Sequence, residues 1–283
     1  MNNRRTTEIL LAFCLIVVAA TGYILVTALD RLRFELESLH TTVRALNEKV
    51  SSSPLRAVAP VTPEKRNADV PMANAQFFDP DAVSGDRFIT SIAADTKNMN
   101  YLINNDATLG NALMPRVMDS LGVRAYDDLN KFLPQMAESW NVSPDGLRIR
   151  VKLREGILWH DFTDPVTKKV WKDVPVTSED FKFYVDVVKN PKVDAAPMRT
   201  YLSDLDSVRV INDREFEVLW KKRYFLSLDM TLSLSPLPRH LYHAYEGPFD
   251  PERFNNDNER NRILVGCGPY RFIKWDKGHR ILM

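Results

Sequence analysis

The sequence predicts an α/β domain, with a mixed sheet and flanking helices, that follows a transmembrane helix. Near the N-terminus, residues 9–29 form one apolar stretch, and a heptad pattern and a proline-rich segment come after it. Beyond them, strand patterns of period two alternate with helical patterns, which is typical of domains that contain both element types. With 45% hydrophobic and 27% charged residues, the chain can bury a substantial core, which excludes a disordered protein.

The apolar stretch at residues 9–29 is long enough to cross a membrane. A helix rises about 1.5 Å per residue, and the hydrocarbon core is about 30 Å thick. A cleaved signal peptide is the alternative, because Val18, Ala19 and Ala20 offer small residues before a possible cut. The apolar run continues well beyond them, so we expect an uncleaved anchor.

Residues 30–50 are predicted to form a short, coiled-coil-like helix that can make homo-oligomers. Apolar residues alternate at spacings of three and four, as in an a/d heptad seam. These residues are Leu29, Leu32, Leu36, Leu39, Val43, Leu46 and Val50. A single amphipathic helix lying on the membrane or on the domain is the alternative. Residues 51–76, which are rich in serine and proline, are expected to be an extended linker.

A β-hairpin is the clearest local prediction in the soluble part. Ser143–Gly146 reads as a turn, because proline presets φ and glycine accepts positive φ. Residues 147–154 then alternate apolar and basic side chains, which predicts a strand with one buried face and one solvated face. The net charge is only +1 and no aromatic residues interleave with the basic ones, so we expect no nucleic-acid partner.

Other elements follow from similar local signals. We expect a strand near residues 87–93, then a helix over 107–121 that Asp106 caps, Pro115 kinks or breaks, and Gly122 ends. Thr177 and Asp180 suggest a capping box for a helix that runs to Lys189. A second hairpin is predicted from residues 208–211 and 216–220.

Residues that could carry chemistry are few. His240, His243 and Glu246 have a helical spacing that could present metal ligands, but a zinc site also needs a fourth ligand or an open water position. His160 and Asp161 lack a serine in a GxSxG turn, and the chain has neither an HExxH nor a phosphate-loop motif. Its two cysteines form no CxxC pair. We therefore predict no enzyme, no metal and no cofactor.

Six motifs, taken in chain order, resemble the family 5 extracellular solute-binding proteins, which are peptide receptors of ABC importers. The family patterns are LAESW, an Asp-Gly turn, LREGVKWHDG, PLTAEDV, LPKHL and GTGPYRF. The matching segments are Met136–Trp140, Pro144–Gly146, Leu153–Asp161, Pro175–Phe181, Leu237–Leu241 and Gly266–Phe272. Two departures stand out: a charged insertion at Phe162–Lys172 replaces a short turn, and Cys267 replaces the usual threonine or serine.

The resemblance implies a fold and a function. Residues 77–283 would be the first lobe of a class II periplasmic-binding-protein-like receptor, in which two lobes close around a ligand. The ligand would be an oligopeptide or dipeptide-like molecule, and ABC permease subunits in the membrane would be the partners. Asn104, Asn105 and Asp106 would face the ligand cleft. The domain would lie on the periplasmic or extracellular side of the cytoplasmic membrane, which places residues 1–8 in the cytoplasm. The alternative is an anchored sensory or interaction protein that has kept the lobe without transport.

Overall fold

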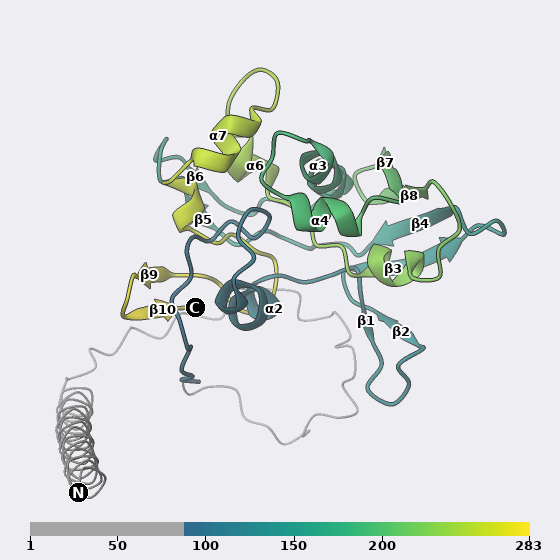
Figure 1. The fold of residues 1–283 in the computed structure, drawn as a ribbon, viewed down its shortest axis with the longest axis horizontal. Helices are drawn as coiled ribbons and strands as arrows, with labels where there is room; N and C mark the ends of the chain where they lie inside the picture. Colours follow the sequence, from purple (N-terminus) through teal and green to yellow (C-terminus); the bar gives the residue numbers. More distant parts are fainter. Residues whose placement is uncertain (1–87) are drawn as a thin grey trace, which may run out of the picture. The chain divides into compact units, whose positions relative to one another are not determined.

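The computed structural model describes residues 88–283, which belong to the unit Lys65–Met283 (Figure 1). The predicted transmembrane helix, heptad helix and linker lie outside these described residues. Within residues 88–283, none of the helices combines the length and the apolar character needed to span a bilayer.

A four-stranded sheet forms the centre of the described domain. Its strands are β3 (Ala137–Val142), β4 (Arg148–Leu153), β7 (Leu205–Asn212) and β8 (Glu215–Trp220), in the order β3-β4-β8-β7. Every pairing in it is antiparallel, so the predicted mixed sheet is wrong for this part of the chain. The reason is local: β3–β4 and β7–β8 are hairpins, and the two hairpins join edge to edge through β4 and β8.

The first hairpin has the predicted turn and alternation. Gly146 has a φ of +73°, and its N–H donates to the Ser143 carbonyl at 2.8 Å. Ile149, Val151 and Leu153 are fully buried. The opposite face carries cross-strand ion pairs, Arg150 with Glu215 and Lys152 with Glu138, at 2.7 and 2.9 Å. The basic residues therefore lie on a solvated strand face, as predicted.

Helix α3 (Ser178–Lys189) covers the apolar face of the sheet. It begins where the capping box predicts, since the Thr177 N–H donates to Asp180 Oδ2 at 2.9 Å. Phe181 of α3 stacks on Phe216 of β8 with ring centroids 5.0 Å apart. The short helix α4 (Ala196–Tyr201) follows and leads into β7.

The helix predicted over residues 107–121 is shorter than expected. A π-helical turn, η2 (Thr108–Leu113), leads directly into α2 (Met114–Val117), and Met118 is already extended. Pro115 lies at the start of α2, where its missing N–H removes one helical hydrogen bond, and π turns often accompany such interruptions. Gly122 is not a helix stop: it begins β1 (Gly122–Arg124), which pairs with β2 (Phe132–Pro134).

Helix α2 ends at Val117 because a distant segment takes its last carbonyl groups. The Gly268 N–H donates to the Val117 carbonyl, and the Tyr270 N–H donates to the Arg116 carbonyl, both at 2.9 Å. A Cβ atom at Gly266 would lie only 1.8 Å from the Val117 carbonyl oxygen. The glycines of residues Gly266–Tyr270, the GCGPY segment, therefore allow two backbones to meet. No local sequence pattern predicts this contact.

Residues 88–93 form no strand, so that prediction is wrong for the described part of the segment. Phe88 and Ile89 are 73% and 79% exposed, and none of the strands formed by residues 88–283 pairs with them. The remaining elements are short and connect or flank the core. They are α5 (Ser227–Leu232), α6 (Arg239–Tyr242), α7 (Pro251–Asn256), η3 (Arg260–Arg262), and the β9–β10 ribbon (Lys274–Asp276 and Arg280–Leu282).

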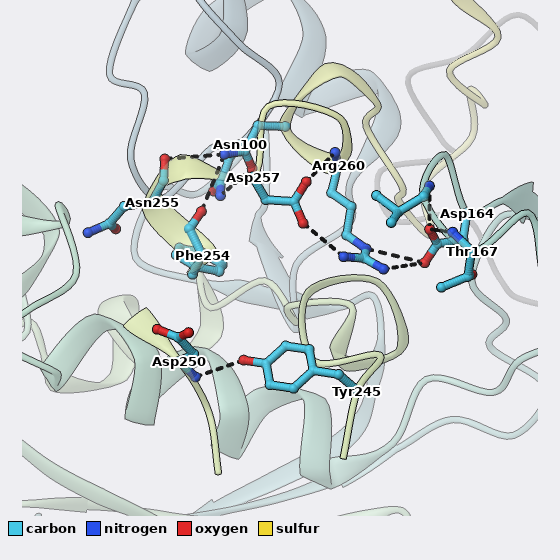
Figure 2. A network of polar contacts seen from close by, with 11 residues as sticks. Asn100, Asp164, Thr167, Tyr245, Asp250, Phe254, Asn255, Asp257 and Arg260 are labelled. Atoms are coloured by element: carbon cyan, nitrogen blue, oxygen red, sulfur yellow. Dashed lines mark hydrogen bonds and ion pairs between the residues drawn. The ribbon is translucent and has the colours of Figure 1, made fainter. Parts of the chain in front are cut away.

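The insertion at residues 162–172 forms a small ribbon of β5 (Phe162–Thr163) and β6 (Val170–Trp171). A buried ion pair attaches it to the C-terminal part of the domain. Arg260 Nη2 lies 2.9 Å from Asp164 Oδ2, and the two side chains are 2% and 0% exposed (Figure 2). Asp257 holds the other side of the guanidinium at 2.8 Å. The ion pair thus fastens the insertion to the domain, although Asp164 is the one buried residue among residues 162–172.

Candidate functional site

A cavity of about 490 Å³ lies beside the loop that the sequence singles out. Its walls come from five parts of the chain: residues 101–107, η2 with α2, α3, α4, and the segment after α5. The lining residues are Tyr101, Asn104, Asn105, Asp106, Ala107, Leu109, Gly110, Asn111, Met114, Tyr184, Met198, Ser233 and Ser235. This volume lies within the range of roughly 300–1,000 Å³ that is common for small-molecule sites.

Asn104 and Asp106 hold the loop in shape. The Asn104 side chain is buried, and its Nδ2 donates to Thr96 Oγ1, the Asn98 carbonyl and Asp106 Oδ2 at 2.7–2.8 Å. Asp106 Oδ1 accepts from the Leu109 N–H at 2.8 Å, which is the predicted cap of the following helix. These two predicted site residues line the cavity, but their polar atoms bind the protein itself.

The Asp106 carboxylate accepts further hydrogen bonds through Oδ2. The donors include Thr96 Oγ1 at 2.8 Å and the Lys97 N–H at 2.9 Å. Burial opposes ionisation of this carboxyl group, but the Leu109 and Lys97 amides outweigh it, so the pKa of Asp106 lies below its usual value. The group is therefore a fixed anion whose oxygens are occupied.

Asn105 differs from its two neighbours. Its side chain is exposed at the rim of the cavity, and it makes no hydrogen bond with the described residues. A short amide has both a donor and an acceptor, so Asn105 can bind an external polar group. Of the three predicted residues, it is the one whose side chain is available.

The apolar part of the cavity was not predicted from the sequence. Tyr101 and Tyr184 are core residues, and Met198 lies on α4. The Tyr101 hydroxyl donates to the Pro236 carbonyl at 2.5 Å. Only packing brings these residues together with the loop, because their separation along the chain leaves no local signal.

The histidines that the sequence singled out have other environments. Helix α6 ends at Tyr242, so His243 and Glu246 lie beyond it and the assumed helical spacing does not hold. His240 lies among Trp159, Phe162 and Trp171, at centroid distances of 5.3–5.7 Å. Among residues 88–283, no group of three histidine, cysteine or acidic residues is placed to hold a metal ion.

His160 is buried. The His160 ring nitrogen Nε2 lies 2.8 Å from the Gly268 carbonyl oxygen, and the His160 backbone N–H donates to the Gly266 carbonyl at 2.7 Å. The neighbouring Trp159 is 2% exposed, and its Nε1 donates to Asp180 Oδ2 at 3.2 Å. His160 therefore binds the Gly266–Tyr270 segment, Trp159 binds α3, and neither residue lines the cavity.

Comparison with known proteins identifies a family. Residues 131–283, more than half of the chain, match the sequences described as bacterial extracellular solute-binding proteins, family 5 Middle. A curated relative is the oligopeptide-binding protein AliB of Streptococcus pneumoniae serotype 4. It is 29% identical over 103 residues, which make up 36% of this chain and 14% of AliB.

Solved structures share the fold. The ABC transporter-associated periplasmic binding protein DppA of Helicobacter pylori, in complex with the peptide STSA, superposes with a TM-score of 0.53 at 22% identity, covering 66% of this chain and 36% of DppA. A dipeptide binding protein from Pseudoalteromonas sp. SM9913, in complex with Met-Leu, gives 0.53 at 18% identity, covering 66% and 37%. The described domain therefore has an α/β fold of the periplasmic-binding-protein type, and the chain spans little more than a third of these structures.

Proposed function

The chain belongs to the bacterial extracellular solute-binding proteins, family 5, and from this premise we propose that it is the substrate-binding component of an ABC-type peptide importer. Its ligand is an oligopeptide, a dipeptide or a similar small solute. The observation that carries the proposal is the cavity beside Asn104–Asp106, which has an apolar interior and uncommitted polar groups at its rim. The relatives named above are described as oligopeptide- and dipeptide-binding proteins, which supports the same ligand class.

Asn105 is proposed to contact the ligand directly, and Asn104 and Asp106 are proposed to position it. A peptide group needs one donor and one acceptor, and the Asn105 amide supplies both. Asn104 and Asp106 fix the loop through their hydrogen bonds with Thr96 and Leu109. This division follows from which polar atoms are already occupied.

Transport would use closure of two lobes around the ligand, followed by docking on permease subunits. The described domain would supply one of the two faces. An interaction at a face open to water is weak, because high dielectric reduces electrostatic contributions. We therefore expect weak peptide binding by this chain alone and tighter binding when a second lobe covers the cavity.

We further propose that residues 9–29 anchor the protein in the cytoplasmic membrane, with the domain on the periplasmic or extracellular side. Residues 30–50 would then form a homo-oligomeric stalk. Changing Leu36 and Leu39 to glutamine should abolish cross-linking of the stalk in membranes, because each buried leucine contributes on the order of 1.5–3 kcal/mol. Unchanged cross-linking would show that the a/d residues of positions 30–50 do not hold the protein together.

The binding proposal is tested by titrating peptides and monitoring the titration with ligand-observed NMR, which detects weak complexes. Gly110 lines the cavity, and nothing lies within 4 Å of a Cβ atom placed there. Gly110→Leu should therefore occupy part of the cavity without disturbing the core and should abolish peptide binding. Gly110→Ala is the matched control and should retain binding.

Asn105→Ala provides the second arm of this test. Loss of one hydrogen bond at an exposed site should weaken peptide binding roughly three- to tenfold. Equal binding by the wild type, Gly110→Leu and Asn105→Ala would show that peptides do not use this cavity. Absence of binding by the wild type, both alone and with a second lobe, would contradict the proposed function itself.

A further inference from the structure

We infer that the cavity beside Asn104–Asp106 receives one uncharged, apolar side chain of the ligand and discriminates against acidic side chains. This inference rests on the proposed function, because it names the part of a peptide that the cavity reads. It goes further in assigning a selectivity to side chains that lie on four separate elements.

The inner surface of the cavity is mainly apolar. Leu109 is fully buried, and Tyr184 is only 6% exposed. The Tyr101 ring packs against the main hydrophobic core, and its hydroxyl is already bound to the Pro236 carbonyl, so the ring presents carbon atoms to the cavity. Burial also raises the pKa of Tyr101, which keeps its hydroxyl neutral.

Two methionines make this surface adaptable. Met114 and Met198 line the cavity from α2 and α4, and both are partly exposed. An unbranched thioether side chain can change rotamer to fit ligands of different shape. The cavity can therefore accept leucine-, methionine- or phenylalanine-like groups without a fixed outline.

The charges around the cavity oppose an acidic ligand group. No lysine, arginine or histidine is among the described residues that line it, and Asp106 is its one charged side chain. A ligand carboxylate would leave water without gaining a cation, and it would lie near a second carboxylate. A ligand ammonium group would lie near Asp106. Both Asp106 oxygens already accept hydrogen bonds from the protein, so the attraction to an ammonium group would be limited.

Four short polar side chains of the lining are exposed or partly exposed and have no partner among the described residues. Asn105, Asn111 and Ser233 are exposed, Ser235 is partly exposed, and none of these side chains is hydrogen bonded to the described residues. Short amides and hydroxyls can bind the peptide backbone in either direction. The geometry thus places a backbone-binding rim above an apolar interior that takes a side chain.

The test uses the full chain in nanodiscs of deuterated lipid and tripeptides Gly-X-Gly with X as leucine, phenylalanine, lysine or aspartate. Burial of an apolar side chain should make the leucine and phenylalanine peptides bind about tenfold more tightly than the aspartate peptide. The lysine peptide should fall between them. In saturation-transfer NMR, the protons of the apolar X side chain should show the strongest signal.

A charge change provides the matched variants. Met198→Lys should raise affinity for the aspartate peptide about two- to fivefold and lower affinity for the leucine peptide. Met198→Gln, which is polar but neutral, should lower affinity for the leucine peptide without any gain for aspartate. An equal gain in affinity for the aspartate peptide with Met198→Gln would show that the cavity does not discriminate by charge.

The outcomes separate this inference from the proposed function. Equal affinity for all four peptides, or saturation centred on their backbones, would overturn the selectivity and leave peptide binding intact. Tightest binding of the aspartate peptide would overturn it as well. If none of the peptides binds, even at millimolar concentration and with a second lobe present, the proposed function falls together with the inference.

Discussion

At the residue scale, Gly266 shows how one missing carbon atom determines an approach between distant segments. The GCGPY segment lies directly on the end of α2, and Gly268 meets the same backbone, with a Cβ position 2.8 Å from the Val117 carbonyl carbon. The Val117 atoms that these Cβ positions would meet belong to the backbone, so a larger residue at position 266 or 268 must displace backbone. The family pattern contains glycine at both positions, and the structure supplies a physical reason for it.

Gly266→Ala should therefore lower the free energy of unfolding by about 2–4 kcal/mol, because overpacking forces the backbone to shift. Gly110→Ala is the control: it lies in a helical turn with open space around Cβ, and it should raise stability by about 0.5–1 kcal/mol. Urea denaturation followed by tryptophan fluorescence measures both. Equal stability of the two variants would contradict the steric explanation.

Protonation of His240 should lower the stability of the folded domain. Burial, together with the nearby Lys169 charge, lowers the pKa of His240 to about 4. The ordinary histidine pKa is about 6.5, so the unfolded chain binds a proton over this interval and the folded chain does not. The contribution of neutral His240 to the free energy of unfolding is therefore fully present above about pH 6.5 and is lost as the pH falls toward 4.

His240→Phe should remove this dependence. Its Nε2 is buried without a hydrogen-bond partner in the described part of the chain, and three aromatic rings surround it, so phenylalanine suits the site. Between pH 7 and pH 5 the wild type should lose roughly 2 kcal/mol relative to the variant. The pKa of Asp180, raised by burial to about 6, acts in the opposite direction in both proteins and cancels in the comparison. Parallel stability curves would exclude His240 as the cause.

At the scale of elements, the inserted β5–β6 ribbon depends on the buried ion pair of Asp164 and Arg260. The Arg260 Nε and Nη2 atoms both donate to Asp164 Oδ2, at 3.2 and 2.9 Å. Asp164 Oδ1 accepts from the Val166 and Thr167 amides, which closes the turn between the two strands (Figure 2). One carboxylate thus shapes the ribbon and fastens it to η3.

Removing one partner of this pair should be much more harmful than removing both. Asp164→Asn keeps an acceptor for the turn but leaves the buried guanidinium with less compensation, so we expect a loss of about 3–5 kcal/mol. Arg260→Met should cost a similar amount. The double variant should be less destabilised than the sum of the two changes, as measured in a double-mutant cycle. Additive losses would show that the two charges do not interact.

Local elements were predictable from the sequence, and contacts between distant elements were not. The Pro144–Gly146 turn and the Thr177–Asp180 capping box depend only on residues close together in the sequence. Their hydrogen bonds confirm both predictions. The end of α2 depends on Gly268 and Tyr270, which no local pattern reveals. For the same reason Asn104–Asp106 could be proposed as a site, whereas the Tyr184 and Met198 walls could not.

At the scale of the whole molecule, the chain combines a domain of known family with an N-terminal region whose predicted anchor lies outside the described residues. Arginines lie on both sides of residues 9–29, at Arg4 and Arg5 and again at Arg31 and Arg33, so charge alone does not orient the segment. The family supplies the direction, because extracellular solute-binding proteins function outside the cytoplasm. A receptor tethered this way stays at the membrane surface, where permease subunits lie.

Retention of residues 9–29 is therefore the prediction that tests the anchored receptor as a whole. Their length exceeds that of a normal signal-peptide core, and hydrophobic insertion of a full span is effectively irreversible. We expect the mature protein to remain in the membrane fraction after high-salt washing and to be released only by detergent. N-terminal sequencing should give a chain that still includes residues 9–29. A soluble product that begins at Thr21, directly after Val18-Ala19-Ala20, would show that the segment is a cleaved signal peptide and that the domain reaches its permease by diffusion.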